Sequence, residues 1–497
     1  MLSLLFFLGR GFARIMYDVA VIGAGITGGA VAMELATYDL RIALIEKNTD
    51  VAAGTTKANS GIIHGGYDPE PGTLMARYNV LGNRMAGELC ANLDVPFKRI
   101  GSLVLAFTEE DLETVNLLYA RGIKNGLSCL SILNREEVLA LEPQLNPSVL
   151  GALRCESTSI VSPFEYGVAM CENAVENGAE LFLETEVTAI TDEGPYYAIS
   201  TNNPEQPLIA ARMIVNAAGV DAASVHDMAD TPEFSIQPNK GEYYLLDKNQ
   251  GGLVSHVVFQ CPGKAGKGVL VTPTVHGNLI VGPNAEDVED GGDVSTSRRG
   301  LDFVMETAAR SCKGISYRDN IRNFAGNRAI LREKDDFHMA FSKNAHRMLN
   351  LAGIKSPGLT CAPAIAVDAV KMLGERGLRL IPKEKVITTR RRVKFAELPI
   401  LEKEQLIAQN PAYGRVICRC ETVTEGEIVD QLRRPIVPRT LDAIKRRAGA
   451  GMGRCQGGFC GPRVHEIIAR ELGLDPLDIR KDDRGSYILT GITKGGQ

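Results

Sequence analysis

The hydrophobic positions near the start of the chain group into a strand, a glycine-rich turn, a helix and a second strand. An apolar, β-rich run, YDVAVI, is followed by Gly23, Gly25 and Gly28 and then by a helical pattern. The second apolar strand, RIALIEK, ends in Glu46. Glycines between a strand and a helix, with an acid closing the next strand, are typical of a βαβ unit that binds a dinucleotide.

Each residue type in this motif has a physical role. Glycine lets the backbone turn tightly and approach a pyrophosphate, and the helix N-terminus stabilises the negative charge of that group. The Glu46 carboxylate can accept hydrogen bonds from ribose hydroxyls. The motif alone does not separate NAD from FAD, and a tight turn without a ligand is the alternative interpretation.

Two later apolar strands also run into glycine-rich turns. They are RMIVNAAGV (212–220) and RMLNLAGIKSPGLTCAPA (347–364), and neither contains a second dinucleotide motif. We therefore predict one dinucleotide. A helix that begins after Gly353 and Gly358 suits a flavin, whose N1 and C2 carbonyl gain negative charge on reduction.

Four cysteines near the C-terminus form two close pairs. Cys418 and Cys420 are spaced C-x-C, and Cys455 and Cys460 are spaced C-x4-C. Zinc pairs usually have two to four intervening residues, so C-x-C is narrow for zinc. Four thiolates suit a [2Fe-2S] cluster, and nearby glycines would let backbone N–H groups point at its sulfurs. Zinc and unligated thiols remain the alternatives.

Composition limits the class of protein. The 497 residues are 44% hydrophobic and 23% charged, with a formal net charge of −5, which fits a folded protein and not a nucleic-acid binder. The apolar run 2–8 is too short to span a bilayer and lacks the features of a secretory signal. Seven lone cysteines before residue 411 are expected to be buried thiols in a reducing, cytoplasmic compartment.

Three segments resemble the FAD-dependent D-amino-acid-oxidase superfamily: KANSGIIHGGYDPEPGTLMARYN (57–79), PNKGEYYLLD (238–247) and FAGNRAILREKDDF (324–337). Within it they are most similar to the branch of L-2-hydroxyglutarate dehydrogenases and bacterial glycerol-3-phosphate dehydrogenases. The resemblance covers about 16–380. It implies a Rossmann-like α/β flavin domain interleaved with a mostly antiparallel α+β substrate domain. The flavin contacts that we assign, besides the glycines and Glu46 above, are Ser60, Gly61, Ala218, Gly219 and Leu359.

The cysteine pairs resemble the bacterioferritin-associated-ferredoxin type of [2Fe-2S] domain, which is small and helical. In that domain Thr424 and Glu427 form a predicted capping box, and Pro462 falls in the first turn of a predicted helix. Arg390, Arg391 and Arg392 are expected on a solvated face, with docking to a partner or a membrane as the alternative.

The predicted parts of the chain are an extension (1–15), nucleotide-binding segments (about 16–90, 150–220 and 340–380), substrate-domain segments (about 91–149 and 221–339), a linker (381–412), the cluster domain (413–480) and a tail (481–497).

The resemblance also suggests which residues meet the substrate. Arg328 occupies the position of an arginine that binds an anionic group, and His64 could remove a proton from an alcohol. Lys240 could hold a second anionic oxygen or polarise the reacting carbon. A surface ion pair, a solvent-facing lysine and a structural histidine are the alternatives for these three residues. Covalent flavin attachment through His64 also stays open.

A flavin with a cluster indicates a dehydrogenase that passes electrons to a partner subunit, a quinone or another carrier. This leaves open a location at the inner face of a membrane, through a partner. The favoured reaction is oxidation of sn-glycerol 3-phosphate to dihydroxyacetone phosphate, which the appended cluster domain supports. Oxidation of L-2-hydroxyglutarate is the second hypothesis, an amine or opine substrate the third, and a non-enzymatic redox or iron-sulfur scaffold the competitor.

Overall fold

A mixed eight-stranded sheet contains the glycine-rich motif. The computed structural model describes residues 15–262, 268–491 and 493, so residues 1–14 of the predicted extension lie outside it. The centre of the sheet is parallel, in the order β9 (Glu180–Phe182), β2 (Ile42–Ile45), β1 (Met16–Ile22), β12 (Leu208–Asn216) and β20 (Met348–Ala352). Antiparallel strands extend it: β10 (Val187–Asp192), β11 (Tyr197–Thr201) and β19 (His338–Phe341).

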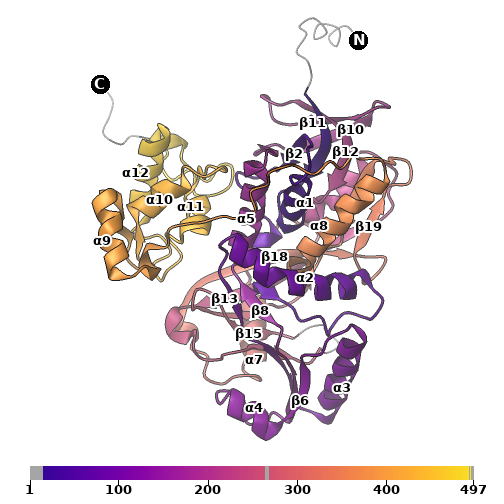
Figure 1. Ribbon diagram of the computed structural model, residues 1–497. Coiled ribbons are helices and arrows are strands. Elements are labelled where there is room, and N and C mark those ends of the chain that lie inside the picture. The colour runs from indigo at the N-terminus through magenta and orange to yellow at the C-terminus, as the bar shows by residue number, and fades with distance from the viewer. Residues whose placement is uncertain (1–14, 263–267, 492, 494–497) are drawn as a thin grey trace, which may run out of the picture.

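Layers of side chains cover both faces of these parallel strands, which explains why the strands are apolar throughout. Val19, Ala20 and Val21 of β1 are fully buried. Helices α1 (Ile26–Leu35), α5 (Pro163–Glu176) and α8 (Gly358–Glu375) pack together on one side of the sheet, and α2 (Leu74–Asn92) packs against α8 (Figure 1). The arrangement confirms the predicted Rossmann-like domain.

A nine-stranded, mostly antiparallel sheet forms the substrate domain. Its order is β17 (Glu286–Asp287), β13 (Ile236–Leu246), β16 (Leu279–Gly282), β15 (Leu270–Pro273), β14 (Val257–Gln260), β5 (Ser102–Ala106), β7 (Gly151–Cys155) and β6 (Leu130–Asn134), and β18 (Asn320–Leu331) pairs with β13. Helices α3 (Glu109–Lys124), α4 (Arg135–Leu141) and α7 (Arg298–Ala308) pack on it. Because β7 belongs to this sheet, the second nucleotide-binding segment begins beyond residue 155 and not near 150.

Shorter elements join the two sheets. Strands β3 (Ile62–Ile63), β8 (Ser159–Val161) and β4 (Phe97–Arg99) form a small antiparallel sheet, and helix α6 (Ala222–Asp227) follows β12. No helix among the described residues is long and apolar enough to cross a bilayer. Of the seven lone cysteines, Cys129 and Cys261 are half-buried and the other five are buried, so the expected burial is found for five of the seven.

The C-terminal domain is a small helical unit. It contains the hairpin β21 (Val416–Cys418) and β22 (Val423–Thr424), with helices α10 (Glu425–Gln431), α11 (Leu441–Ala448) and α12 (Gly461–Leu472). The capping box of Thr424 and Glu427 is present, and Pro462 lies in the first turn of α12, as predicted. The predicted linker is not wholly irregular, because it includes helix α9 (Ile400–Gln409).

Buried ion pairs fasten this domain to the flavin domain. Asp50 accepts hydrogen bonds from Arg446 at 2.9 Å and from Arg447 at 2.7 Å, and all three side chains are buried. Burial raises the pKa of Asp50, but the two guanidinium groups outweigh burial and hold the pKa at about 2. The two domains therefore form one packed unit, in which C-terminal orange and yellow ribbons lie beside α5 (Figure 1).

The prediction that the run Arg390, Arg391 and Arg392 lies on a solvated face is wrong for two of the three residues. Arg390 is 3% exposed and donates to Glu172 at 2.7 Å, and Arg392 donates to Glu165 at 2.6 Å. Only Arg391 is exposed. Carboxylates supplied by α5 account for this burial, and they lie too far away in the sequence for the local charge pattern to reveal them.

The predicted tail also begins with an ordered contact. Asp482 pairs with Arg446 at 3.0 Å and with Lys57 at 2.9 Å, next to the nucleotide motif. Residues 481 and 482 thus belong to the packed unit, while residues 492 and 494–497 lie outside the described part of the chain.

Candidate active site and iron-sulfur centre

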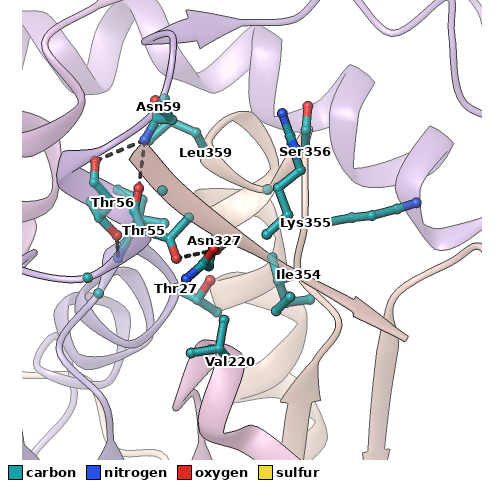
Figure 2. Close-up of a pocket in the computed structure, with 18 of the residues that line it drawn as sticks. Thr27, Thr55, Thr56, Asn59, Val220, Asn327, Ile354, Lys355, Ser356 and Leu359 are labelled. Carbon is teal, nitrogen blue, oxygen red and sulfur yellow. Dashed lines mark hydrogen bonds between the residues drawn. The ribbon is translucent and has the colours of Figure 1, made fainter. Parts of the chain in front are cut away.

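A cavity of about 1140 Å³ lies between the two sheets. Its lining comes from the glycine-rich motif, the segment after β2, the ends of β12 and β20, and the paired strands β13 and β18. Figure 2 shows Thr55, Thr56 and Asn59, which belong to the segment after β2, near Asn327 of β18. Residues 354–356 lie nearby. The volume exceeds the usual range for a small-molecule site, about 300–1,000 Å³, as a dinucleotide together with a substrate requires.

The glycines of the motif are required by close backbone packing. A side chain at Gly28 would place its Cβ 1.8 Å from the Gly23 carbonyl oxygen, and one at Gly23 would lie 2.5 Å from the Ala217 carbonyl oxygen. Gly23 also has a φ of +100°, which favours glycine. The first amides of α1 have no intrahelical acceptor, so this helix end suits a pyrophosphate.

Replacing Gly28 by alanine is expected to abolish FAD binding, because the added methyl group collides with backbone and displaces the motif. The purified variant should fold but carry less than a tenth of the flavin absorbance of the wild type. Gly252→Ala is the matched control, since a Cβ at that exposed position meets no atom within 4 Å. Full flavin content in Gly28→Ala would contradict the assignment of this motif.

Glu46 lies at the cavity wall, where a nucleotide-binding acid belongs. It is 7% exposed and accepts hydrogen bonds from the amides of Ala24 and Asn48, both at 2.9 Å. Burial raises the pKa of Glu46, and these hydrogen bonds oppose that rise. The residue can accept a hydrogen bond from a ribose while it also fixes the turn after β1.

The other predicted flavin contacts divide into residues that line the cavity and residues that shape it. Gly61 has a φ of +65°, and a Cβ there would lie 2.5 Å from the Val161 carbonyl oxygen, so it shapes the backbone beneath the site. Gly28 and Gly353 also lie behind the lining residues. The predicted contacts that line the cavity are Gly23, Gly25, Glu46, Ser60, Ala218, Gly219, Gly358 and Leu359.

His64 faces the same cavity from the segment after β3. Its Nε2 lies 3.4 Å from the Ser356 hydroxyl, and its ring stacks on Phe259 with centroids 5.9 Å apart. The backbone is held as well, because its N–H donates to the Thr360 hydroxyl at 2.9 Å and its carbonyl accepts from Asn79 at 2.7 Å. This fixed, half-buried imidazole is placed to exchange a proton with a bound molecule.

Arg328 lines the cavity from β18. Its Nη1 donates to the Asn239 side-chain oxygen at 2.6 Å, and its Nη2 donates to the Asn284 carbonyl at 3.2 Å. Gly241 leaves room for the guanidinium, since a Cβ there would lie 2.7 Å from Nη2. Each of the two nitrogens carries a second hydrogen, so the group can still bind an anion.

Lys240 does not line this cavity. It is 5% exposed and its ammonium pairs with Asp293 at 2.7 Å. Successive side chains of a strand point to opposite faces, so Asn239 and Tyr243 of β13 face the cavity while Lys240 points away. In place of the predicted contact with a substrate oxygen, Lys240 therefore contacts the loop of Asp293. Residues 291, 292 and 294 of this loop line the cavity.

Sequence reasoning missed several residues of the site. Asn239 and Ser356 contact the predicted Arg328 and His64, and Thr56 accepts a hydrogen bond from the Ile26 amide at 2.9 Å. Strand alternation along PNKGEYY could have favoured Asn239 over Lys240 once the cavity face was known. No local signal marked Ser356, because its role depends on a contact with a segment 292 residues away.

The four C-terminal cysteines come together as two pairs. The Cys420 and Cys455 sulfurs are 3.7 Å apart, and Cys418 is in side-chain contact with Cys460. Two thiolates about 2.3 Å from one tetrahedral metal lie about 3.75 Å apart, so the distance between Cys420 and Cys455 fits two ligands of one metal ion. Among the described residues, no three His, Cys, Asp or Glu side chains surround a single metal position.

Backbone amides point at the cysteine sulfurs, as expected for an iron-sulfur site. The Gly451 amide faces Cys418, and the amides of Gly457 and Phe459 face Cys455. Gly449 ends α11 in the left-handed conformation and Gly451 has a φ of +94°. These two glycines form the turn that orients the Gly451 amide toward the Cys418 sulfur. Such hydrogen bonds stabilise thiolates and clusters.

Comparisons with known proteins agree with both sites. A family profile described as FAD dependent oxidoreductase matches residues 18–372, and one described as BFD-like [2Fe-2S] binding domain matches residues 416–470. A glycerol 3-phosphate dehydrogenase from Caloramator mitchellensis is 49% identical over 480 residues, which are 96% of this chain and 99% of that protein. An L-2-hydroxyglutarate dehydrogenase from Escherichia coli O17:K52:H18 is 32% identical over 54% of this chain and 64% of its own length.

A solved structure gives the same result. The FAD-bound L-alpha-glycerophosphate oxidase from Mycoplasma pneumoniae has a TM-score of 0.72 and 32% identity, over 76% of this chain and 98% of that one. The chain therefore belongs to the FAD-dependent oxidoreductase family and carries a BFD-like [2Fe-2S] binding domain in its C-terminal part.

Proposed function

We propose that the chain oxidises sn-glycerol 3-phosphate to dihydroxyacetone phosphate and passes the electrons through its [2Fe-2S] domain to an external acceptor. The observation that carries the proposal is that His64 and Arg328 line the same cavity as the dinucleotide motif. The Caloramator relative, which aligns over nearly all of both chains and bears the name glycerol 3-phosphate dehydrogenase, supports this substrate over a 2-hydroxy acid.

Arg328 binds the phosphate arm in this proposal. Asn239 and the Asn284 carbonyl hold the guanidinium in one orientation, and its remaining N–H groups form a planar fork that matches phosphate. Lys240 acts at a distance, since its ion pair with Asp293 fixes a loop at the cavity wall. The substrate therefore meets a cation that is oriented before it binds.

His64 acts as the base for the secondary alcohol. FAD, when bound, supplies the acceptor for the hydride that leaves the alcohol carbon. As that hydride leaves, the imidazole takes the hydroxyl proton, which is a general-base role that histidine fills most often. Ser356 and Phe259 fix the ring orientation, and Ser356 can carry the proton onward.

Cys418, Cys420, Cys455 and Cys460 would hold the cluster in this proposal. The cluster supplies one-electron transfer to a partner subunit, a quinone or another carrier. A cytoplasmic location, with or without association with a membrane through that partner, stays a prediction.

Anaerobic titration of the purified protein tests the proposal. We expect glycerol 3-phosphate to bleach the flavin absorbance within seconds and L-2-hydroxyglutarate to leave it unchanged, in protein that contains iron and no zinc. Bleaching by L-2-hydroxyglutarate alone would transfer the assignment to the 2-hydroxy acid. A flavin that responds to neither compound, while dithionite still reduces it, would overturn both.

A further inference from the structure

The two cysteine pairs differ in their access to solvent. Cys420 is exposed and Cys455 is half-buried, whereas Cys418 is 1% exposed and Cys460 is 2% exposed. A cluster held by these residues would have one iron, called the outer iron here, beside the solvent-accessible Cys420 and Cys455. Electrons could leave across the surface around these two cysteines without passing through the packed interior.

An aromatic side chain stands on this surface. Phe459 lies between Cys455 and Cys460 and is 86% exposed, the largest exposed fraction among the exposed large hydrophobic residues of the described chain. The Phe459 amide faces the Cys455 sulfur, so its position is fixed by the cluster loop. Folding gains nothing from an exposed phenyl ring, but a protein interface does, because aromatic residues anchor such contacts.

Cations project from the same surface while carboxylates are recessed beneath them. In the pair of Arg454 with Asp247, the arginine side chain is 73% exposed and the carboxylate 12%. In the pair of Lys248 with Glu421, the corresponding fractions are 45% and 15%. A partner that approaches this surface meets the positive member of each pair first, although the whole chain carries a net charge of −5.

Two further arginines flank the cysteines. Arg419 lies between Cys418 and Cys420, is exposed and forms no ion pair with any described residue. Arg463 lies in the first turn of α12 with its side chain 70% exposed, and its contact with Glu466 is long, at 3.6 Å. The Glu466 side chain is itself 66% exposed, so one acid projects beside Arg463.

We propose that the exit face, defined as Arg419, Cys420, Arg454, Phe459 and Arg463, docks an acidic protein that carries one electron at a time. This inference rests on the proposed electron transfer through the cluster and adds the place and the chemistry of the acceptor. The arginines steer the acidic partner, and the Phe459 ring enters an apolar patch on it beside the outer iron. The reduced cluster loses one electron and the carrier gains it, without transfer of a proton or an atom.

Two haem proteins of opposite charge provide the test. The holoenzyme is reduced with dithionite, excess reductant is removed, and the enzyme is mixed with the acidic soluble domain of cytochrome b5 or with basic cytochrome c. We expect fast reduction of cytochrome b5 that slows as salt is added, and slower reduction of cytochrome c that quickens with salt. Reduction by dithionite bypasses the substrate, so a wrong substrate assignment does not affect this result.

Substitutions in the exit face test whether this surface determines the rate of cytochrome b5 reduction. Arg419→Glu combined with Arg463→Glu should lower the cytochrome b5 rate constant at low salt at least tenfold and reverse the preference between the carriers. Phe459→Ser should lower it about fivefold at all salt concentrations. Arg298→Glu combined with Arg299→Glu, on helix α7, changes the net charge equally and should leave the rate unchanged. Calorimetric binding of oxidised cytochrome b5 should weaken in parallel with the rates.

Three outcomes would overturn the proposal. The first is an equal loss of rate in the α7 control, which would show that the rate depends on the net charge of the chain and not on the exit face. The second is unchanged rates in the exit-face variants that retain full iron content. The third is poor reduction of both haem proteins together with fast reduction of menaquinone in anionic vesicles, which would identify a membrane acceptor.

Discussion

Arg328→Ala should raise the KM for glycerol 3-phosphate and lower kcat/KM about 100-fold. Removing the guanidinium eliminates charge-assisted hydrogen bonds to the phosphate, each worth about 1.5–3 kcal/mol, and about 3 kcal/mol corresponds to this factor. The FAD content should not change, because Arg328 holds its partners Asn239 and Asn284 in the substrate domain and not in the glycine-rich motif. Steady-state kinetics with a dye acceptor, together with flavin absorbance, provide the measurement.

Two further variants sharpen this result. Arg328→Lys should recover part of the loss, since lysine restores the charge but not the planar fork. Arg298→Ala removes an arginine whose side chain is 93% exposed on α7 and should have no effect on KM. If Arg328→Ala and Arg298→Ala behave alike, Arg328 does not contact the substrate.

Asp50→Asn should lower the free energy of unfolding by about 3–5 kcal/mol. The substitution removes the carboxylate that Arg446 and Arg447 share. Arg446 keeps Asp482, but the fully buried Arg447 loses its closest carboxylate, and breaking a buried ion pair costs about this much. The domain interface should loosen first, because both arginines belong to α11 of the cluster domain. Calorimetric unfolding of the holoenzyme should show a lower transition temperature or a separate early transition.

The pH dependence of this effect follows from the depressed pKa of Asp50. The ionised carboxylate stabilises the folded state above its unfolded pKa, ordinarily 3.8, and that contribution is lost as the pH falls through about 2. The stability difference between wild type and Asp50→Asn should therefore be full at pH 6 and shrink below pH 4. The exposed pair of Arg298 and Asp302 is the control, and Asp302→Asn should cost less than about 0.5 kcal/mol. A difference that grows in acid would contradict the ion-pair assignment.

The parts of the fold that local patterns encode were predictable. The glycine spacing before α1, the apolar strand β1 and the capping box at Thr424 each depend on neighbours in the sequence, and the structure contains all three. Spacing also identified the four cysteines, although in the structure each residue contacts a member of the other sequence pair. The side of β13 that faces the cavity was not predictable, and for that reason the sequence predicts Lys240 at the cavity wall where the structure has Asn239.

The domain interface could not be predicted for a different physical reason. A run of three arginines is hydrophilic in isolation, and only carboxylates far away in the sequence make burial favourable. Glu172 of α5 forms ion pairs with Arg390 and Arg434, which come from two later segments of the chain. A single sequence contains no local trace of such long-range charge pairing, so composition favoured solvent exposure.

The buried charges around Asp50 and Glu172 also bear on how fast electrons can cross the molecule. A domain tethered only by a flexible linker would have to search for a productive orientation before each transfer, and its turnover would slow in a viscous solvent. Here Arg446 and Arg447 fix the orientation before any electron arrives. The separation of the two redox centres is consequently a constant of the fold, and viscogens should leave the internal transfer rate untouched.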